Sequence, residues 1–200
     1  MNLIYGTTNK SKITFMQNRI KHLGIKILSL NDVNAPRLDI AENGSNPLEN
    51  ARIKALAYYD ALKMPIFSCD SGLYIDGLAE EKQPGINIRG IGDYMDDHTA
   101  ITYYSKLAEE MGGGMIARYK NAICLILDDG QIYEHMGEDI ASEPFILSSK
   151  PHPKRNKGFP LDSLSINIKS GKYYFDMDNT EKYVKMDDGF TLFFQRVLGI

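Results

Sequence analysis

Long apolar runs are missing from this chain of 200 residues, and their absence excludes one class of protein. A membrane-spanning helix needs ~18 or more consecutive apolar residues, and no stretch reaches that length. The chain starts with an apolar strand pattern and shows neither the charged nor the apolar region of a secretory signal. We therefore expect a cytoplasmic protein that does not bind a membrane.

Cysteine and excess positive charge are also scarce. The two cysteines, Cys69 and Cys124, lie far apart in apolar runs, which is typical of buried thiols in a reducing compartment and not of a disulfide or a metal site. The formal net charge of −3 argues against general nucleic-acid binding. Repeats, low-complexity segments and heptads are absent too. The composition favours a single globular domain spanning residues 1–200.

A carboxylate-bearing stretch at residues 68–78 stands at the centre of the chain. Residues 66–69 are an apolar run that leads to Asp70, Ser71 and Gly72, and a second apolar pulse then leads to Asp76. A carboxylate at the end of a strand beside a glycine is a natural place for a metal or a polarised water. The same three residues also make an ordinary turn, and the residues alone leave both interpretations open.

The first unit of the chain is predicted to be strand, polar loop and helix. Residues 2–5 are an apolar strand pattern, and residues 13–23 carry apolar side chains at helical spacing before Gly24. The loop between them is rich in hydroxyl, amide and lysine groups: Thr7, Thr8, Asn9, Lys10, Ser11 and Lys12. Such a loop at a helix N-terminus suits a phosphate, and it equally suits a capped helix with solvated lysines. The glycine pattern of a Walker loop is absent.

Further helices are expected after residue 46, after residue 97 and at the end of the chain. Asn46 is a good N-cap, and Glu49 completes a capping-box-like pair. Asp97 is the expected N-cap of the next helix, and Leu192 is expected on the buried face of the closing helix. A basic, proline-rich segment at residues 150–157 is either a flexible flap over phosphates or a solvated loop.

Seven short motifs occur in a specific order along nearly the whole chain. They are residues 7–12 (T-G-N-x-x-K, with Thr8 in place of glycine), 48–55 (F-x-E-N-A-x-x-K-A), 70–78 (D-S-G-L-x-V-D-A-L), Pro84-Gly85 with Arg89, 117–119 (A-R-F), 158–162 (G-F-G-Y-D-P) and Glu181-Lys182. In this order the chain resembles the Ham1-like inosine/xanthosine triphosphate pyrophosphatases.

The resemblance implies a fold, a reaction and a set of site residues. The fold would be an elongated α/β architecture with a long twisted mixed sheet, flanking helices and two lobes that share a cleft, commonly as a homodimer. The reaction would be hydrolysis of a nucleoside triphosphate to a monophosphate and pyrophosphate with Mg²⁺. The catalytic residues would be Asp70, Lys12 and Lys54, and the metal ligands Asp70 and Glu42 with Glu49 in reserve. Substrate would contact residues 7–11, Ser71, Arg89, Phe159, Asp162, Lys182, Asp187 and Asp188.

Two departures from the family pattern bear on activity. Cys69 stands where the family has an acidic residue before the catalytic aspartate, and a neutral thiol is a poor ligand for Mg²⁺. Asp187 and Asp188 stand where the family has histidine and arginine, which read the 6-oxo group of the base. Two hydrogen-bond donors have thus become acceptors, so the base preference would be relaxed or altered. The alternative is a catalytically weakened nucleotide-binding protein of the same fold.

Overall fold

The computed structural model describes residues 1–90, 95–178 and 189–200. Its α-helices are α1 (Lys10–Ile20), α2 (Pro47–Leu62), α3 (Asp97–Glu110) and α4 (Gly189–Leu198). Its strands are β1 (Asn2–Tyr5), β2 (Lys26–Leu28), β3 (Ile66–Ile75), β4 (Gly114–Ile126), β5 (Ile132–His135), β6 (Phe145–Ser148) and β7 (Ser165–Asn167). In the ranges described, no helix has the length and apolar character needed to cross a bilayer.

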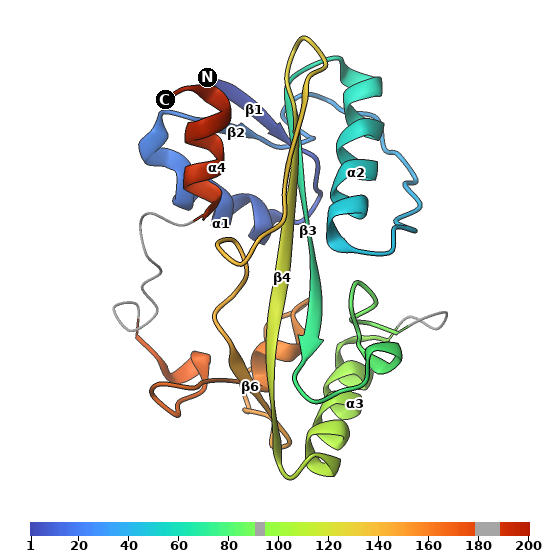
Figure 1. Ribbon diagram of the computed structural model, residues 1–200, viewed down its shortest axis with the longest axis vertical. Coiled ribbons are helices and arrows are strands. Elements are labelled where there is room, and N and C mark those ends of the chain that lie inside the picture. The colour runs from blue at the N-terminus through green and yellow to red at the C-terminus, as the bar shows by residue number, and fades with distance from the viewer. Residues whose placement is uncertain (91–94, 179–188) are drawn as a thin grey trace. The chain divides into compact units, whose positions relative to one another are not determined.

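The strands form one mixed sheet, as the sequence predicts. Its order is β2-β1-β3-β4-β6-β7, with β5 also paired to β4 (Figure 1). β1 runs parallel to both β2 and β3. β4 runs antiparallel to β5 and to β6, and β6 runs antiparallel to β7. Parallel strands joined by helices and antiparallel hairpins therefore coexist, which confirms the expected α/β class.

The chain divides into two compact units. Unit 1 comprises residues 1–71, 120–141 and 185–200, and unit 2 comprises residues 72–119 and 142–184. β3 and β4 each contribute residues to both units. Every buried cluster lies within one unit, so each unit is described by itself. The shared cleft between two lobes stays a prediction.

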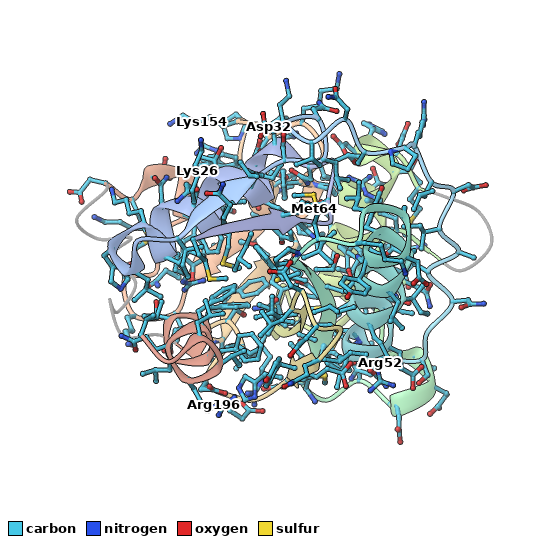
Figure 2. The ribbon with its side chains drawn as sticks, turned by 90° about the horizontal axis from the view of Figure 1, so that it is seen from above. Lys26, Asp32, Arg52, Met64, Lys154 and Arg196 are labelled. Carbon is cyan, nitrogen blue, oxygen red and sulfur yellow. The ribbon has the colours of Figure 1, made fainter. Side chains whose placement is uncertain are left out.

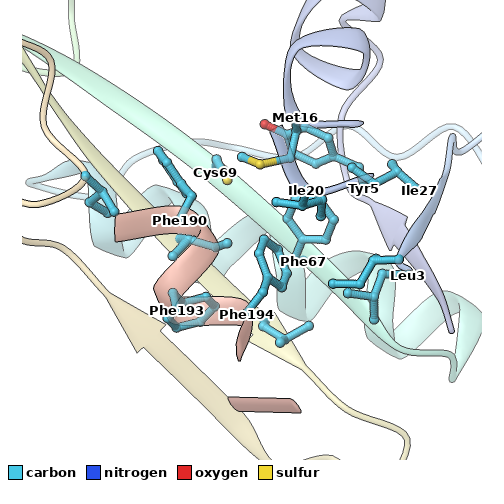
Figure 3. Close-up of a cluster of buried hydrophobic side chains, with 14 residues drawn as sticks. Leu3, Tyr5, Met16, Ile20, Ile27, Phe67, Cys69, Phe190, Phe193 and Phe194 are labelled. Carbon is cyan, nitrogen blue, oxygen red and sulfur yellow. The ribbon is translucent and has the colours of Figure 1, made fainter. Parts of the chain in front are cut away.

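Helices cover both faces of the sheet in unit 1. α1 and α4 pack over one face and α2 over the other (Figure 1). Phe194 of α4 lies edge-on to Phe67 of β3 with ring centroids 5.3 Å apart, and Phe67 stacks on Tyr5 of β1 at 4.4 Å (Figure 3). On the other face, Arg52 of α2 forms two bonds to the Glu134 carboxylate of β5, at 2.6 and 2.5 Å (Figure 2 labels Arg52). The C-terminal helix thus completes the core around the N-terminal strands.

Unit 2 has its own core. α3 contributes Ile101, Tyr104 and Ala108, and the strands contribute buried side chains from β3, β4 and β6. The short 3₁₀ helix η3 (Pro160–Ser163) adds Leu161, which is 3% exposed. This core fixes the base of α3 and the chain just after residue 159.

Three sequence-based expectations need correction. β3 does not turn at Asp70 but continues to Ile75, because long-range partners satisfy its polar residues. The N-cap of α3 is Asp96, whose carboxylate accepts from the Thr99 N–H, and Asp97 is the first helical residue. Leu192 is 51% exposed, while Phe190, Phe193 and Phe194 form the buried face of α4.

Candidate active site

The centre of the candidate site in unit 1 is an ammonium group held by two carboxylates. Lys54 Nζ donates to Asp70 Oδ1 at 3.0 Å and to Glu42 Oε2 at 2.8 Å. The Lys54 and Asp70 side chains are 12% and 13% exposed, and that of Glu42 is 44% exposed. Burial alone would lower the pKa of Lys54, but the two carboxylates outweigh it and raise that pKa above its ordinary value. Lys54 is therefore a permanent cation at neutral pH.

Each member of this group is positioned by its own element. Asp70 lies in β3 and Lys54 lies on α2, one helical turn after Asn50. The buried Asn50 amide oxygen accepts from the Gly44 N–H at 2.8 Å, which ties the segment carrying Glu42 to the start of α2. The next residue of β3 is held as well, since Ser71 Oγ donates to Asn121 Oδ1 at 2.7 Å. Asn121, a polar residue inside a long apolar strand pattern, is a member that the sequence prediction missed.

The polar loop before α1 is a capped helix start. Asn9 Oδ1 accepts from the N–H groups of Ser11 and Lys12, at 2.9 and 3.3 Å. The Thr7 hydroxyl accepts from the Asn9 N–H, and Thr8, Lys10 and Ser11 are exposed. A cap and a phosphate-binding loop are compatible, because hydroxyls and lysine side chains remain at the helix N-terminus.

Gly6 explains why this loop can approach β3 closely. A Cβ at position 6 would lie 2.5 Å from Ser68 Oγ, so only glycine fits. The Gly6 N–H donates to the Phe67 carbonyl at 2.8 Å, and the Ser68 hydroxyl donates to the Gly6 carbonyl at 3.1 Å. These bonds join the end of β1 to the part of β3 that precedes Asp70.

Cys69 reports the charges around Asp70. Its thiol is buried, and this burial raises its pKa to about 12, against opposing effects of Lys12 and Lys54. The thiol is therefore neutral at physiological pH and does not act as a thiolate. The influence of both lysines on this one group places Lys12 and Lys54 around the same short stretch of β3, as the sequence prediction requires.

Glu49 has a structural partner set of its own. Its carboxylate accepts from the Ser45 N–H at 2.7 Å, from the Ser45 hydroxyl at 3.0 Å and from the Asn46 amide at 3.3 Å. These bonds lower the pKa of Glu49, the largest effect being that of the Ser45 N–H. Glu49 thus caps α2, and the metal proposal below is built on Asp70 and Glu42.

Unit 2 contains the other candidate substrate residues that the structure describes. Phe159 is half-buried and precedes η3. Asp162 accepts from the Asn156 amide at 2.8 Å, and burial raises its pKa. The Arg89 guanidinium donates to Asp97 Oδ1 at 2.6 Å and to the Gly158 carbonyl at 3.1 Å, so Arg89 is engaged by protein groups next to Phe159. Lys182, Asp187 and Asp188 lie outside the described residues.

A metal site has to be judged from the donor set. Within the described ranges, no three His, Cys, Asp or Glu side chains gather in a way that could hold a metal ion. Mg²⁺ in phosphate-handling sites commonly takes one or two carboxylates and completes its shell with water and substrate phosphates. Asp70 and Glu42 already share one cation, the Lys54 ammonium. Their oxygens suit such a two-carboxylate site.

Comparison with known proteins identifies the family. The Ham1 family profile matches residues 3–183. The chain is 38% identical over 181 residues to a dITP/XTP pyrophosphatase of Halalkalibacterium halodurans, covering 90% of this chain and 89% of that protein. It is 28% identical over 186 residues to a dITP/XTP pyrophosphatase of Rhodopseudomonas palustris, covering 90% and 84%.

Solved structures support the same fold. The Ham1 protein of Staphylococcus aureus matches with a TM-score of 0.72 and 20% identity, covering 100% of this chain and 99% of that one. A Ham1 protein of Coxiella burnetii matches with a TM-score of 0.69 and 23% identity, covering 90% and 89%. From the profile match over most of its length, the chain belongs to the Ham1 family.

Proposed function

We propose that this protein hydrolyses nucleoside triphosphates to nucleoside monophosphates and pyrophosphate, with non-canonical purine nucleotides as substrates. The observation that carries the proposal is the Lys54 ammonium bonded to Asp70 and Glu42, beside a polar loop that opens a helix. Similarity to curated dITP/XTP pyrophosphatases supports the same reaction.

The residues of unit 1 match the needs of this reaction. A water oxygen attacks the α-phosphorus, the bond from that phosphorus to the α–β bridging oxygen breaks, and pyrophosphate leaves with the electron pair. Asp70 either accepts the proton of the attacking water or binds the metal. Lys12 and Lys54 stabilise the negative charge that builds up on the phosphate oxygens. Thr7, Thr8, Lys10 and Ser11 offer further donors at the helix N-terminus.

Mg²⁺ is the proposed cofactor, held by Asp70 and Glu42. When bound, it polarises phosphate oxygens and offsets their charge. Its ligands can be tested by measuring the Mg²⁺ concentration that gives half-maximal activity. We expect Glu42→Gln to raise this concentration by about tenfold, the scale of one lost charge contact. Glu49→Gln is the matched control, and a larger effect of Glu49→Gln than of Glu42→Gln would contradict this assignment.

The base is proposed to stack on Phe159, with Asp162 framing it. Asp187 and Asp188 stand where the family has two donors, so we propose a base preference that differs from that of the relatives. A pocket that loses a specific donor can lose several kcal/mol of discrimination. The test is kcat/KM for ITP, XTP, dUTP, GTP and ATP. Selectivity for ITP and XTP of more than about 100-fold over GTP, some 3 kcal/mol, would contradict an altered preference.

Loss of catalysis is the alternative outcome. Cys69 motivates it, because its neutral buried thiol replaces an acidic family residue. Tight nucleotide binding without pyrophosphate release from any triphosphate would favour a binding protein. The homodimer implied by the resemblance also stays a prediction, and light scattering on the purified protein tests it.

A further inference from the structure

We propose that Asp97 and Arg89 are positioning residues that hold the turn at Gly158 and thereby fix Phe159 for base stacking. This inference rests on the proposed function and deepens it, since it concerns recognition of the base. All three groups lie in unit 2. Arg89 was predicted from the sequence to contact substrate, and Asp97 to cap a helix. The structure gives both a different set of partners.

The three groups form a closed hydrogen-bond network. Asp97 Oδ2 accepts from the Gly158 N–H at 2.8 Å, and Asp97 Oδ1 accepts from the Arg89 guanidinium at 2.6 Å. The same guanidinium nitrogen donates to the Gly158 carbonyl at 3.1 Å. Both polar groups of Gly158 are thus held by charged side chains, and charge-assisted bonds are the stronger kind. The network spans 69 residues of sequence between Arg89 and Gly158.

The turn itself leaves these groups of Gly158 available. The Phe159 N–H donates to the Asn156 carbonyl at 2.9 Å, which closes a turn over residues 156–159. Gly158 is the third residue of this turn and has φ of +85°, a conformation that favours glycine. Its N–H and carbonyl are not used in closing the turn, so they can bond to Asp97 and Arg89.

Apolar packing on one side of the turn is incomplete. A cavity of about 630 Å³ lies between α3 and residues 151–160, and its walls include Asp97, Ile101, Ser105, Asn156 and Pro160. Ser105 Oγ is buried without a hydrogen-bond partner among the described residues. The hydrogen-bond network therefore has to do what close packing does elsewhere.

Phe159 lies between two fixed points. On its N-terminal side is Gly158 in the network, and on its C-terminal side are Pro160 and Leu161, which are buried in unit 2. The Gly158 N–H and the Arg89 guanidinium lower the pKa of Asp97, the N–H effect being the larger. The Asp97 carboxylate is therefore ionised at neutral pH, as both bonds require.

The test uses two neighbouring aspartates in the full-length protein. Asp97→Asn and Asp97→Ala remove the charged acceptor, whereas Asp96→Asn keeps the α3 cap, because asparagine caps as well as aspartate. Hydrogen exchange reports the Gly158 amide, and kinetics report KM and kcat for the best triphosphate. We expect Asp97→Ala to abolish Gly158 protection, and both Asp97 variants to raise KM about tenfold with kcat within threefold. Asp96→Asn should match the wild type in both readouts.

Two results would overturn the inference. One is unchanged Gly158 protection in Asp97→Ala, and the other is lost protection with KM still within twofold of the wild type. If the wild-type protein releases no pyrophosphate, the proposed reaction fails, and the Kd of the nucleotide measured by calorimetry replaces KM as the deciding quantity. An unchanged Kd in Asp97→Ala would then overturn the positioning role.

Discussion

At the scale of single residues, Lys54 shows how two opposing effects set one charge. Burial of an ammonium costs several kcal/mol. Each carboxylate lies about 3 Å away, and at an effective dielectric constant of ~20 each such contact contributes about 5 kcal/mol before desolvation. Two carboxylates therefore outweigh the burial, which agrees with the raised pKa of Lys54. The same charge is then available to a polyphosphate.

This balance predicts a dependence of stability on alkaline pH. Because the pKa of Lys54 is higher in the folded than in the unfolded protein, its contribution is complete below the unfolded pKa of ~10.4. It is lost as pH rises through the folded pKa. We expect denaturation midpoints of the wild type to fall above pH ~10.5 more steeply than those of Lys54→Met. The difference between the two proteins should be constant from pH 7 to 9.

Lys63→Met is the control for that experiment. Lys63 pairs with Asp60 at 2.9 Å, but its side chain is 67% exposed, so its removal should change little at any pH. Equal alkaline slopes for the wild type and Lys54→Met would contradict the account of Lys54.

At the scale of secondary-structure elements, the start of α1 combines capping with the proposed binding of phosphate. Asn9 uses the N–H groups of Ser11 and Lys12 for the cap. Asn9→Ala should lower the free energy of unfolding by about 1 kcal/mol. Asn9→Asp should keep that stability, because aspartate caps equally well, yet raise KM for a triphosphate about tenfold by repulsion. Thermal denaturation and steady-state kinetics separate the two roles, and an unchanged KM in Asn9→Asp would argue against phosphate binding at this loop.

Local elements of this chain could be predicted from the sequence, and contacts between distant segments could not. The Asn46 cap and its Glu49 partner are four residues or fewer apart, so the pattern alone predicts them. Continuation of β3 through Asp70 depends on Lys54, and continuation through Ser71 depends on Asn121, fifty positions away. No periodicity carries that information.

The same limit explains the choice between Asp96 and Asp97. Both are good N-cap residues by type, and only the Gly158 turn, 61 positions beyond Asp97, makes Asp97 more useful elsewhere. Cys69 is the converse case, because burial of a cysteine in an apolar run follows from the run itself. The resemblance located Asp70, Lys54 and Glu42, whose contact the structure then describes.

At the scale of the whole molecule, unit 1 is built from the two ends of the chain. Phe194 of α4 is fully buried against Phe67 of β3, while Leu192 on the same helix is 51% exposed. Phe194→Ala should cost about 3–5 kcal/mol, and Leu192→Ala less than about 0.5 kcal/mol. Hydrogen exchange of the β1 and β3 amides measures this cost within unit 1. Similar costs for the two variants would contradict the described packing of α4.

The central claim is that Asp70 serves metal-dependent release of pyrophosphate. The most direct test measures pyrophosphate from a panel of nucleoside triphosphates, with Mg²⁺ or with EDTA, for the wild type, Asp70→Asn and Asp76→Asn. Asp76 is an exposed carboxylate that follows β3, so it is the matched control. We predict turnover by the wild type and Asp76→Asn that EDTA abolishes, and a loss of at least ~100-fold in Asp70→Asn. Turnover that survives EDTA or Asp70→Asn, or no turnover of any triphosphate by the wild type, would contradict the account.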